Sequence, residues 1–294
     1  MLNDPQPPDK RRHPLAEQPR RRHPLEEAPQ PPPPPQQEPP ERRRVIMEMP
    51  LSPPRATYAL ILINVIVFAV GLLSPELDNQ IFALGASRTY EVLVLGDYYR
   101  MVTAMFLHGG AMHILFNMYA LYIIGRAIEP VFGSVRFLIV YLLGGLAGSI
   151  LSVVLGNPSP MLGVPSVGAS GAVFALFGAE MVYLYRHRQL MGERATRQLR
   201  SLLWLLAVNI FIGVASWTDA SAIRIDNWAH MGGLAGGLIL TWLIGPVFVA
   251  QPHPLNPNHR IAEDTNPLSK KYWAVSVYGI VLIAILAFFT LRVR

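Results

Sequence analysis

The 294-residue sequence contains no cysteine, and this absence excludes disulfide bonds and thiolate metal sites. Charged residues make up only 15% of the chain, whereas hydrophobic residues make up 51% and the mean hydropathy is +0.31. So few charges are unusual in a water-soluble domain and are expected where lipid replaces water as the solvent. The net charge is +6, but no basic face lies on a foldable soluble domain, so we expect no nucleic-acid binding.

Residues 1–54 differ from the rest of the chain because they are rich in Pro, Arg, Glu and Gln and include the run Pro31–Pro35. Such a segment cannot bury enough apolar surface to offset the entropy of ordering it. We therefore predict a disordered, cytoplasmic tail. A partner that binds this proline-rich tail is an open alternative.

Seven apolar segments follow the tail, and each is close to the roughly 20 residues that cross about 30 Å of hydrocarbon. Between the first two, residues 74–111 mix polar and aromatic residues, which predicts a structured loop at the membrane interface. We expect an all-α, polytopic transmembrane bundle, with a six-helix domain over 55–250, a cytoplasmic linker over 251–271 and a seventh membrane helix over 272–294. The apolar segments are 57–73, 112–128, 135–155, 168–185, 201–217, 228–249 and 272–291.

The distribution of Lys and Arg between the segments predicts the orientation of the chain. A cytoplasmic N-terminus places most of these residues in cytoplasmic loops, including the five arginines between Arg186 and Arg200. The C-terminus is then external, and segments two, four and six run from the outside to the inside.

Four polar residues lie near the external ends of these inward-running segments: His113, Asn117, Ser170 and His230. Polar residues within spans are costly and usually face a cavity or a functional site. Ser170 precedes Arg186 by 16 residues, which is about 24 Å of helix, and similar counts apply to His113 and His230. The three segments therefore place their polar residues at one depth, several ångströms below the external surface.

Ser170 lies in the sequence Gly168-Ala169-Ser170-Gly171, at the start of an apolar segment. Small neighbours leave its hydroxyl accessible, and free N–H groups at a helix N-terminus stabilise negative charge. These features suit a nucleophile. They also suit a serine that only caps a helix within a glycine-rich contact.

His230 lies beside a ridge of small residues formed by Ala229, Gly233 and Gly237, on which another helix can approach closely. A serine on that helix would then lie within hydrogen-bonding reach of the imidazole, as an activated hydroxyl requires. A histidine that only bonds two helices together is the alternative.

His113 and Asn117 are four residues apart and share one helical face. Both side chains can donate hydrogen bonds to a developing oxyanion, although they could instead bond neighbouring helices. A zinc site that includes His108 and His113 is a third reading, which the absence of an H-E-x-x-H motif disfavours. We expect neither a metal nor a cofactor.

Together, these motifs resemble those of the rhomboid family of intramembrane serine proteases, over residues 57–250. His113 and Asn117 match the family's H-x-x-x-N, Gly168–Gly171 matches G-x-S-G, and Ala229–Gly237 matches A-H-x-x-G-x-x-x-G. The resemblance implies a six-helix rhomboid core, with a seventh helix as in some members. It also implies that Ser170 is the nucleophile and His230 the general base, and that His113, Asn117 and the Ser170 N–H form the oxyanion hole.

The first loop departs from the family pattern, because Tyr99-Arg100 stands where Trp-Arg is frequent. That loop is structural in the family, so Arg100 is expected to support the site together with the motif glycines Gly168, Gly171, Gly233 and Gly237. Asp226 is four residues before His230 and either orients the imidazole or only caps the sixth helix. The resemblance, which implies a Ser–His dyad, favours the cap.

The resemblance implies cleavage of transmembrane proteins near the external ends of their helices, by a multi-pass protein of the bacterial plasma membrane. A catalytically silent rhomboid-like protein that binds or escorts membrane proteins is the alternative. A transporter is a further one, disfavoured because we find no inverted repeat and no carboxylate within the spans suited to ion coupling.

Overall fold

The computed structural model describes residues 46–159, 163–218, 225–256 and 258–293. The predicted tail therefore lies outside the described residues as far as residue 45. The long helices and the strands are β1 (Ile46–Glu48), α1 (Arg55–Gly71), α2 (Pro75–Gly85), α4 (Ala111–Phe132), α5 (Ser134–Leu155), α6 (Ser170–Arg186), α8 (Glu193–Thr218), α9 (Asn227–Ile244), β2 (Phe248–Pro252), β3 (His259–Asp264) and α10 (Tyr272–Val293). Short helical segments are η1 (Tyr90–Leu95), α3 (Arg100–Thr103), η2 (Ala104–Phe106), α7 (Arg188–Met191) and η3 (Leu268–Lys270).

Each predicted apolar segment overlaps one long helix, and the predicted helical bundle is confirmed. Four of these helices, α4, α5, α8 and α10, are long and apolar enough to cross a membrane, and α1 is a shorter apolar helix. The arrangement of six spans plus one stays a prediction. Large apolar side chains are exposed along the bundle, such as Leu62 (59%), Phe211 (74%) and Ile283 (67%). Lipid is the solvent that such a surface requires, so the chain is an integral, multi-pass membrane protein.

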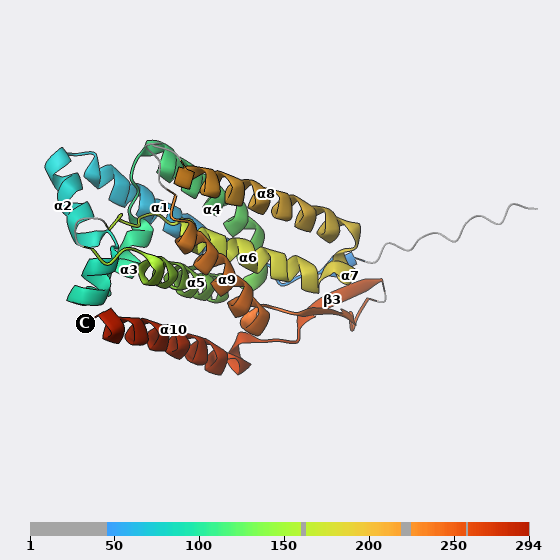
Figure 1. The fold of residues 1–294 in the computed structure, drawn as a ribbon. Coiled ribbons are helices and arrows are strands. Elements are labelled where there is room, and N and C mark those ends of the chain that lie inside the picture. The colour runs from blue at the N-terminus through green and yellow to red at the C-terminus, as the bar shows by residue number, and fades with distance from the viewer. Residues whose placement is uncertain (1–45, 160–162, 219–224, 257, 294) are drawn as a thin grey trace, which may run out of the picture. The chain divides into compact units, whose positions relative to one another are not determined.

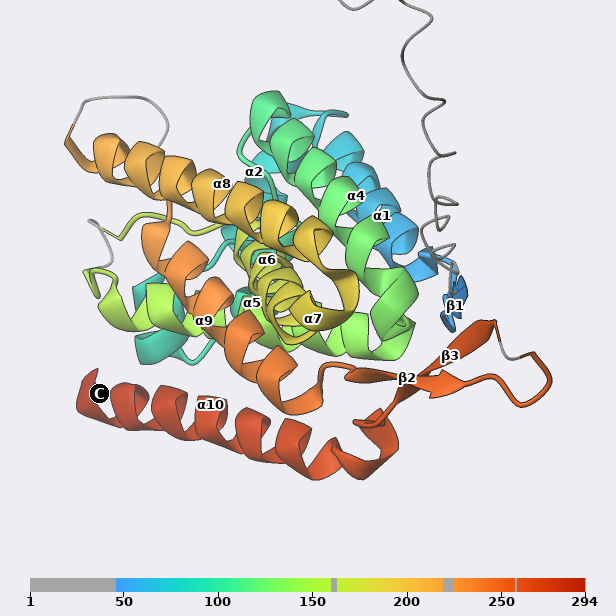
Figure 2. The ribbon, with the colours of Figure 1, turned by 90° about the vertical axis from the view of Figure 1, so that its right-hand side faces the viewer.

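The centre of the bundle consists of α5, α6 and α9, which lie side by side in both views (Figures 1 and 2). Glycines allow the backbones to approach closely. A Cβ atom added at Gly148 of α5 would lie 2.5 Å from the carbonyl oxygen of Ala229, and one at Gly232 of α9 would lie 2.7 Å from that of Ala147. Apolar side chains gain little from leaving lipid, so close backbone contact is what holds these helices together.

The buried carboxylate of Glu129 joins α1 to α4. It accepts hydrogen bonds from the N–H groups of Ala56 (2.8 Å) and Thr57 (2.7 Å), from the Thr57 hydroxyl (2.7 Å) and from the Ser134 hydroxyl (2.6 Å). The first N–H groups of a helix have no partner within it, and a carboxylate there also favours the helix dipole. Glu129 thus caps α1 from a neighbouring helix.

The loop expected over residues 74–111 contains α2, η1, α3 and η2. Ser74 begins α2 by accepting a hydrogen bond from the Leu77 N–H at 3.1 Å. Arg100, which is 8% exposed, binds the Asp97 carboxylate at 2.9 Å and donates to the carbonyl oxygen of Ala83 at 2.6 Å. One buried guanidinium thus fixes the end of α2 to α3.

A three-stranded sheet of order β1-β3-β2 lies at the opposite end of the bundle from α2 (Figure 1). Strand β1 pairs in parallel with β3, and β2 pairs antiparallel to β3. These strands occupy parts of the segments that we expected to be the disordered tail and the linker over 251–271. Asp264 binds Arg136 at the start of α5 (2.8 Å), which attaches the sheet to the helices.

Glu48 of β1 binds the His259 imidazole of β3 at 2.7 Å. This hydrogen bond lowers the pKa of the Glu48 carboxyl below its ordinary value. The segment before α1 is therefore joined to the segment between α9 and α10.

Candidate active site

Ser170 is the first residue of α6, and the loop before it is tied to η2 and to the segment that follows α2. The Gly168 N–H donates to the Ala104 carbonyl oxygen at 2.9 Å, and Ser166 pairs with Ser87 through two backbone hydrogen bonds. Gly168 has a φ of +119°, and a Cβ atom there would lie 2.6 Å from His113 Nε2. Glycine is therefore required at this position both for its backbone conformation and for space.

Helices α6 and α9 touch through their backbones beside Ser170 and His230. A Cβ atom added at Gly233 would collide with the Gly171 carbonyl oxygen, and one added at Gly171 would lie 3.3 Å from the Ala229 carbonyl oxygen. One turn further on, Gly237 packs in the same way against Ala175. The ridge expected from the glycine spacing therefore packs directly against α6.

The His230 imidazole stacks on the Phe174 ring, with 4.2 Å between ring centroids and 12° between planes. Phe174 lies one turn after Ser170 on α6, so the imidazole lies against the helix that Ser170 begins. In this conformation no hydrogen bond joins the side chains of Ser170 and His230, both of which are described. Hydrogen bonds of this kind are often long or absent without substrate and form in the complex.

Asp226 caps α9, because its Oδ1 accepts a hydrogen bond from the Ala229 N–H at 2.9 Å. Its Oδ2 accepts from the Ser152 hydroxyl of α5 at 2.5 Å. Each carboxylate oxygen thus has a partner other than the imidazole. This geometry favours the capping role over an orienting one.

His113 lies close to Ser170. A Cβ atom added at Gly168 would lie 2.6 Å from His113 Nε2 and 3.7 Å from Ser170 Oγ, so both side chains border the same space. Its Nδ1 accepts from the Gly109 N–H at 3.3 Å. Asn117 is 7% exposed, and its amide donates to the His113 carbonyl oxygen of its own helix at 2.9 Å. The structure thus brings His113 to the serine, while the Asn117 amide is engaged within α4.

His108 contributes to the site in a way that the sequence analysis did not anticipate. Its Nε2 accepts from the Ala169 N–H at 3.5 Å, and its ring meets that of His113 edge to face at 5.1 Å. No group of three His, Asp or Glu side chains that could hold a metal is found in the described part of the chain. The two histidines support the serine loop and each other.

A cavity of about 20 Å³ lies beside Ser170, and its polar walls include Ser149, Ser166 and Asp226. That volume holds about one water molecule. Ser149 also donates to the Met101 carbonyl oxygen at 3.0 Å. Ser149 and Ser166 were not identified from the sequence, although the glycine-rich stretch around Ser149 signals a close helix contact.

The N-terminus of α6 offers free donors beside the serine. The first hydrogen bond of the helical pattern runs from the Val173 N–H to the Ala169 carbonyl oxygen at 2.9 Å. The N–H groups before Val173 therefore have no acceptor within the helix. A hydroxyl, an imidazole on a touching helix and free N–H groups are the parts that acyl transfer requires.

From the sequence we found no carboxylate suited to ion coupling within the spans, and we did not discuss Glu180, which lies within α6. Glu180 of α6 is 5% exposed and accepts a hydrogen bond from the Gln198 amide of α8 at 2.6 Å. Since its partner is a neutral amide on the adjacent helix, Glu180 joins α6 to α8.

The sequence matches the Rhomboid domain family over residues 95–247, which contain all of the motif residues above. It is 35% identical over 161 residues to RHOMBOID-like protein 6, mitochondrial, of Arabidopsis thaliana, covering 55% of this chain and 48% of that protein. It is 33% identical over 194 residues to Rhomboid protease GluP of Bacillus subtilis (strain 168), covering 65% of this chain and 35% of that protein.

A third relative, Putative rhomboid protease YdcA of the same bacterium, is 32% identical over 148 residues, which cover 50% of this chain and 68% of that protein. The chain thus spans half or less of the length of the first two relatives and about two thirds of the third. With the match to the domain family and the helical bundle, these likenesses show that the chain belongs to the rhomboid family.

Proposed function

We propose that the chain is a serine-type intramembrane endopeptidase, with Ser170 as the nucleophile and His230 as the general base. The observation that carries this proposal is the glycine contact between α6 and α9, across which the His230 ring stacks one turn away from Ser170. Relatives named as rhomboid proteases support the same activity.

In the first step, Ser170 Oγ attacks a peptide carbonyl carbon of the substrate while the His230 imidazole takes the hydroxyl proton. The carbonyl oxygen becomes an oxyanion, which the free N–H groups at the start of α6 and the His113 side chain can stabilise. The Asn117 amide can join them after leaving the His113 carbonyl oxygen, to which it donates here. His230 then gives its proton to the leaving amine, and the acyl-enzyme forms.

In the second step, a water molecule attacks the acyl-enzyme while His230 takes its proton, and His230 then returns that proton to Ser170 Oγ as the second product leaves. The small polar cavity beside Ser170 is suited to hold that water, because the hydroxyls of Ser149 and Ser166 and the Asp226 carboxylate offer partners.

The substrates that fit this chemistry are single-span membrane proteins with a weakened helix near the external membrane surface. Carbonyl groups in a regular helix are hydrogen-bonded and shielded, so cleavage requires local unwinding. Glycine or proline at the cleavage region lowers the cost of unwinding.

The orientation and the membrane belong to the same proposal. A cytoplasmic N-terminus follows from the arginines between Arg186 and Arg200, and it places Ser170 near the external surface. The bacterial plasma membrane also stays a prediction, because the relatives come from a plant as well as from a bacterium.

A silent binding or escort protein is the second candidate, because such a protein would also lack a hydrogen bond between Ser170 and His230. A fluorophosphonate probe separates the two, because it reacts only with an activated serine. We expect labelling of the wild type and none of Ser170→Ala or His230→Ala. Ser201→Ala is the matched control, because Ser201 bonds only to its own helix at the Arg197 carbonyl oxygen.

Labelling should be followed by incubation with a panel of single-span membrane proteins. Cleavage by the wild type and by Ser201→Ala, but not by Ser170→Ala, would support the protease. A folded wild type that neither reacts with the probe nor cleaves any substrate would refute it in favour of the silent binder.

A further inference from the structure

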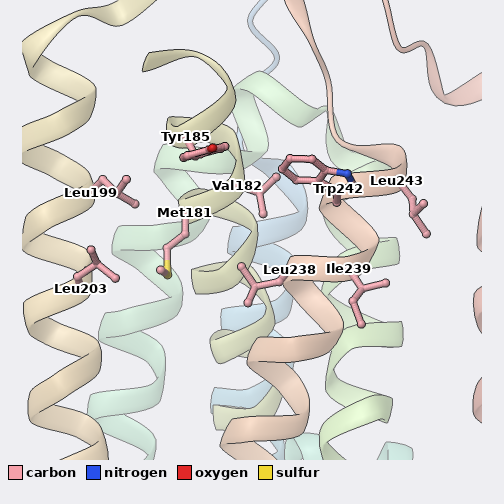
Figure 3. Close-up of a pocket in the computed structure, with 9 residues that line it drawn as sticks. All are labelled: Met181, Val182, Tyr185, Leu199, Leu203, Leu238, Ile239, Trp242 and Leu243. Atoms are coloured by element: carbon pink, nitrogen blue, oxygen red, sulfur yellow. The ribbon is translucent and has the colours of Figure 1, made fainter. Parts of the chain in front are cut away.

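A second cavity, of about 530 Å³, lies between α6, α8 and α9 (Figure 3), and Ser170 is not among the residues that line it. Leu199 and Leu203 form its wall on α8, and Leu238, Ile239 and Trp242 form the wall on α9. The remaining lining residues, Met181, Val182, Tyr185 and Leu243, are also apolar or aromatic. We refer to this cavity as the α8–α9 groove.

The contents of the α8–α9 groove must be apolar, because only Tyr185 and Trp242 offer any polar side-chain atom. Leu203 and Ile239 are 47% and 52% exposed, so the groove opens to the surroundings of the bundle. A transmembrane helix about 10 Å wide and about 30 Å long fills roughly 2,400 Å³, several times the volume present. A lipid acyl chain is the apolar body that a membrane offers at this size.

One end of the groove carries aromatic rings and arginines. Tyr185 and Trp242 lie there, above Met181 and Ile239 (Figure 3), and such residues favour the headgroup level of a membrane. The Arg186 guanidinium lies over the Trp242 ring at 4.5 Å, and that of Arg188 over the Tyr185 ring at 4.2 Å.

Arg186 retains an unused donor. Its Nη1 atom is buried and has no hydrogen-bond partner in the described residues. A buried donor without a partner costs free energy, so turning the Arg186 side chain toward a ligand that supplies an acceptor is favoured. Phosphate oxygens suit a guanidinium particularly well.

The charge around Arg186 also favours an anion. Five arginines lie between residues 186 and 200, whereas the two carboxylates between residues 180 and 200 both have partners. Glu193 binds Arg197 at 3.0 Å, and Glu180 accepts from Gln198 at 2.6 Å.

From these contacts we infer that the α8–α9 groove is a binding site for one anionic phospholipid. One acyl chain fills the groove between α8 and α9, and the phosphate accepts hydrogen bonds from Arg186 beside Trp242. The lipid belongs to the leaflet in which α6 ends. It completes the packing of α8, because only 6% of an 18-residue apolar stretch of that helix is buried within the protein.

Native mass spectrometry of the full chain, with dipalmitoyl phosphatidylglycerol as the probe, tests the inference. We expect the wild type to retain one lipid. Arg186→Gln removes charged hydrogen bonds and should lower retention about tenfold or more. Ile239→Trp fills the groove from α9 and should do the same. Leu203→Trp fills it from α8 and serves as a second, independent obstruction.

Two matched controls accompany these variants. Arg292 lies over the Phe288 ring at 4.8 Å on α10, as Arg186 does over Trp242, so Arg292→Gln should retain the lipid. Ile280 is 64% exposed on α10, so Ile280→Trp should retain it as well. Dipalmitoylglycerol, which lacks the phosphate, should bind more weakly than the phospholipid.

Equal retention of phosphatidylglycerol by the wild type, Arg186→Gln, Ile239→Trp and Leu203→Trp would overturn the inference. So would displacement of the lipid signal by millimolar inorganic phosphate, because the site would then recognise a free anion. Retention of a second copy of the chain, lost in the same groove variants, would assign the groove to a protein interface instead.

Discussion

Asp226 shows at the scale of one residue how hydrogen-bond partners separate two roles. Its oxygens accept from the Ala229 N–H and the Ser152 hydroxyl, which leaves His230 to be held by the Phe174 ring. A general base can therefore be positioned here without a carboxylate, as in the proposed dyad.

Asp226→Asn should accordingly leave turnover of a model substrate within a few-fold of the wild type, because asparagine caps helices about as well as aspartate. Asp226→Ala should lower the free energy of unfolding by about 0.5–2 kcal/mol. Steady-state cleavage and thermal unfolding measure the two effects. A loss of turnover by orders of magnitude in a stably folded Asp226→Asn protein would restore the triad.

His187, at the end of α6, is a buried histidine with a fixed tautomer. Its Nδ1 donates to the Tyr183 carbonyl oxygen at 2.8 Å, and its Nε2 accepts from the Phe248 N–H at 2.8 Å. Burial lowers the pKa of the imidazole below its ordinary value of 6.5. The folded protein therefore holds His187 neutral where the unfolded chain would protonate it.

The stability that His187 contributes should be fully present above pH 6.5 and should be lost as the pH falls below that value. We expect the melting temperature of the wild type to decrease on acidification more steeply than that of His187→Gln, which cannot titrate. Thermal unfolding in detergent at several pH values gives both slopes. Parallel slopes would show that His187 is protonated equally in both states.

The proposed site depends on the contact between helices α6 and α9. A glycine of another helix, Gly279 of α10, offers a control for substitutions in this contact. A Cβ atom at Gly233 would collide with the Gly171 carbonyl oxygen, whereas one at Gly279 of α10 meets nothing within 4 Å. The same substitution should therefore have opposite effects at the two positions.

Gly233→Ala should separate the two helices, lower the free energy of unfolding by about 1–3 kcal/mol and reduce fluorophosphonate labelling strongly. Gly279→Ala should preserve labelling and leave stability equal or higher by up to about 1 kcal/mol, because alanine favours a helix. Unaltered labelling of Gly233→Ala would mean that the Ser170–His230 geometry does not need this contact.

At the scale of the whole molecule, the absence of cysteine makes the membrane topology directly measurable. Leu73, after α1, and Leu255, between β2 and β3, are 78% and 90% exposed. With a cytoplasmic N-terminus, a membrane-impermeant maleimide applied to intact cells should label Leu73→Cys but not Leu255→Cys. Labelling of both after lysis is the control, and the reverse pattern in intact cells would invert the proposed orientation.

Local sequence patterns predicted most of the helices and their central contact, because a membrane span and a glycine ridge each depend on residues that are close in the sequence. The start of α6 at Ser170 and the contact beside Gly233 followed from such patterns. The sheet did not, since β1 has only three residues and pairs with a strand far along the chain. The hydrogen bond of Glu180 could not be predicted either, because its partner, Gln198, lies on another helix.

The sheet has a consequence for biogenesis. Glu48 and His259 are 211 positions apart, so β1 leaves the ribosome long before β3 exists. At about 5–20 residues per second, the wait is roughly 10–40 s, during which the helices from α1 to α9 are synthesised. The join between the two ends of the helical core is thus among the last to form, and a nascent chain halted before β3 would carry an unpaired β1.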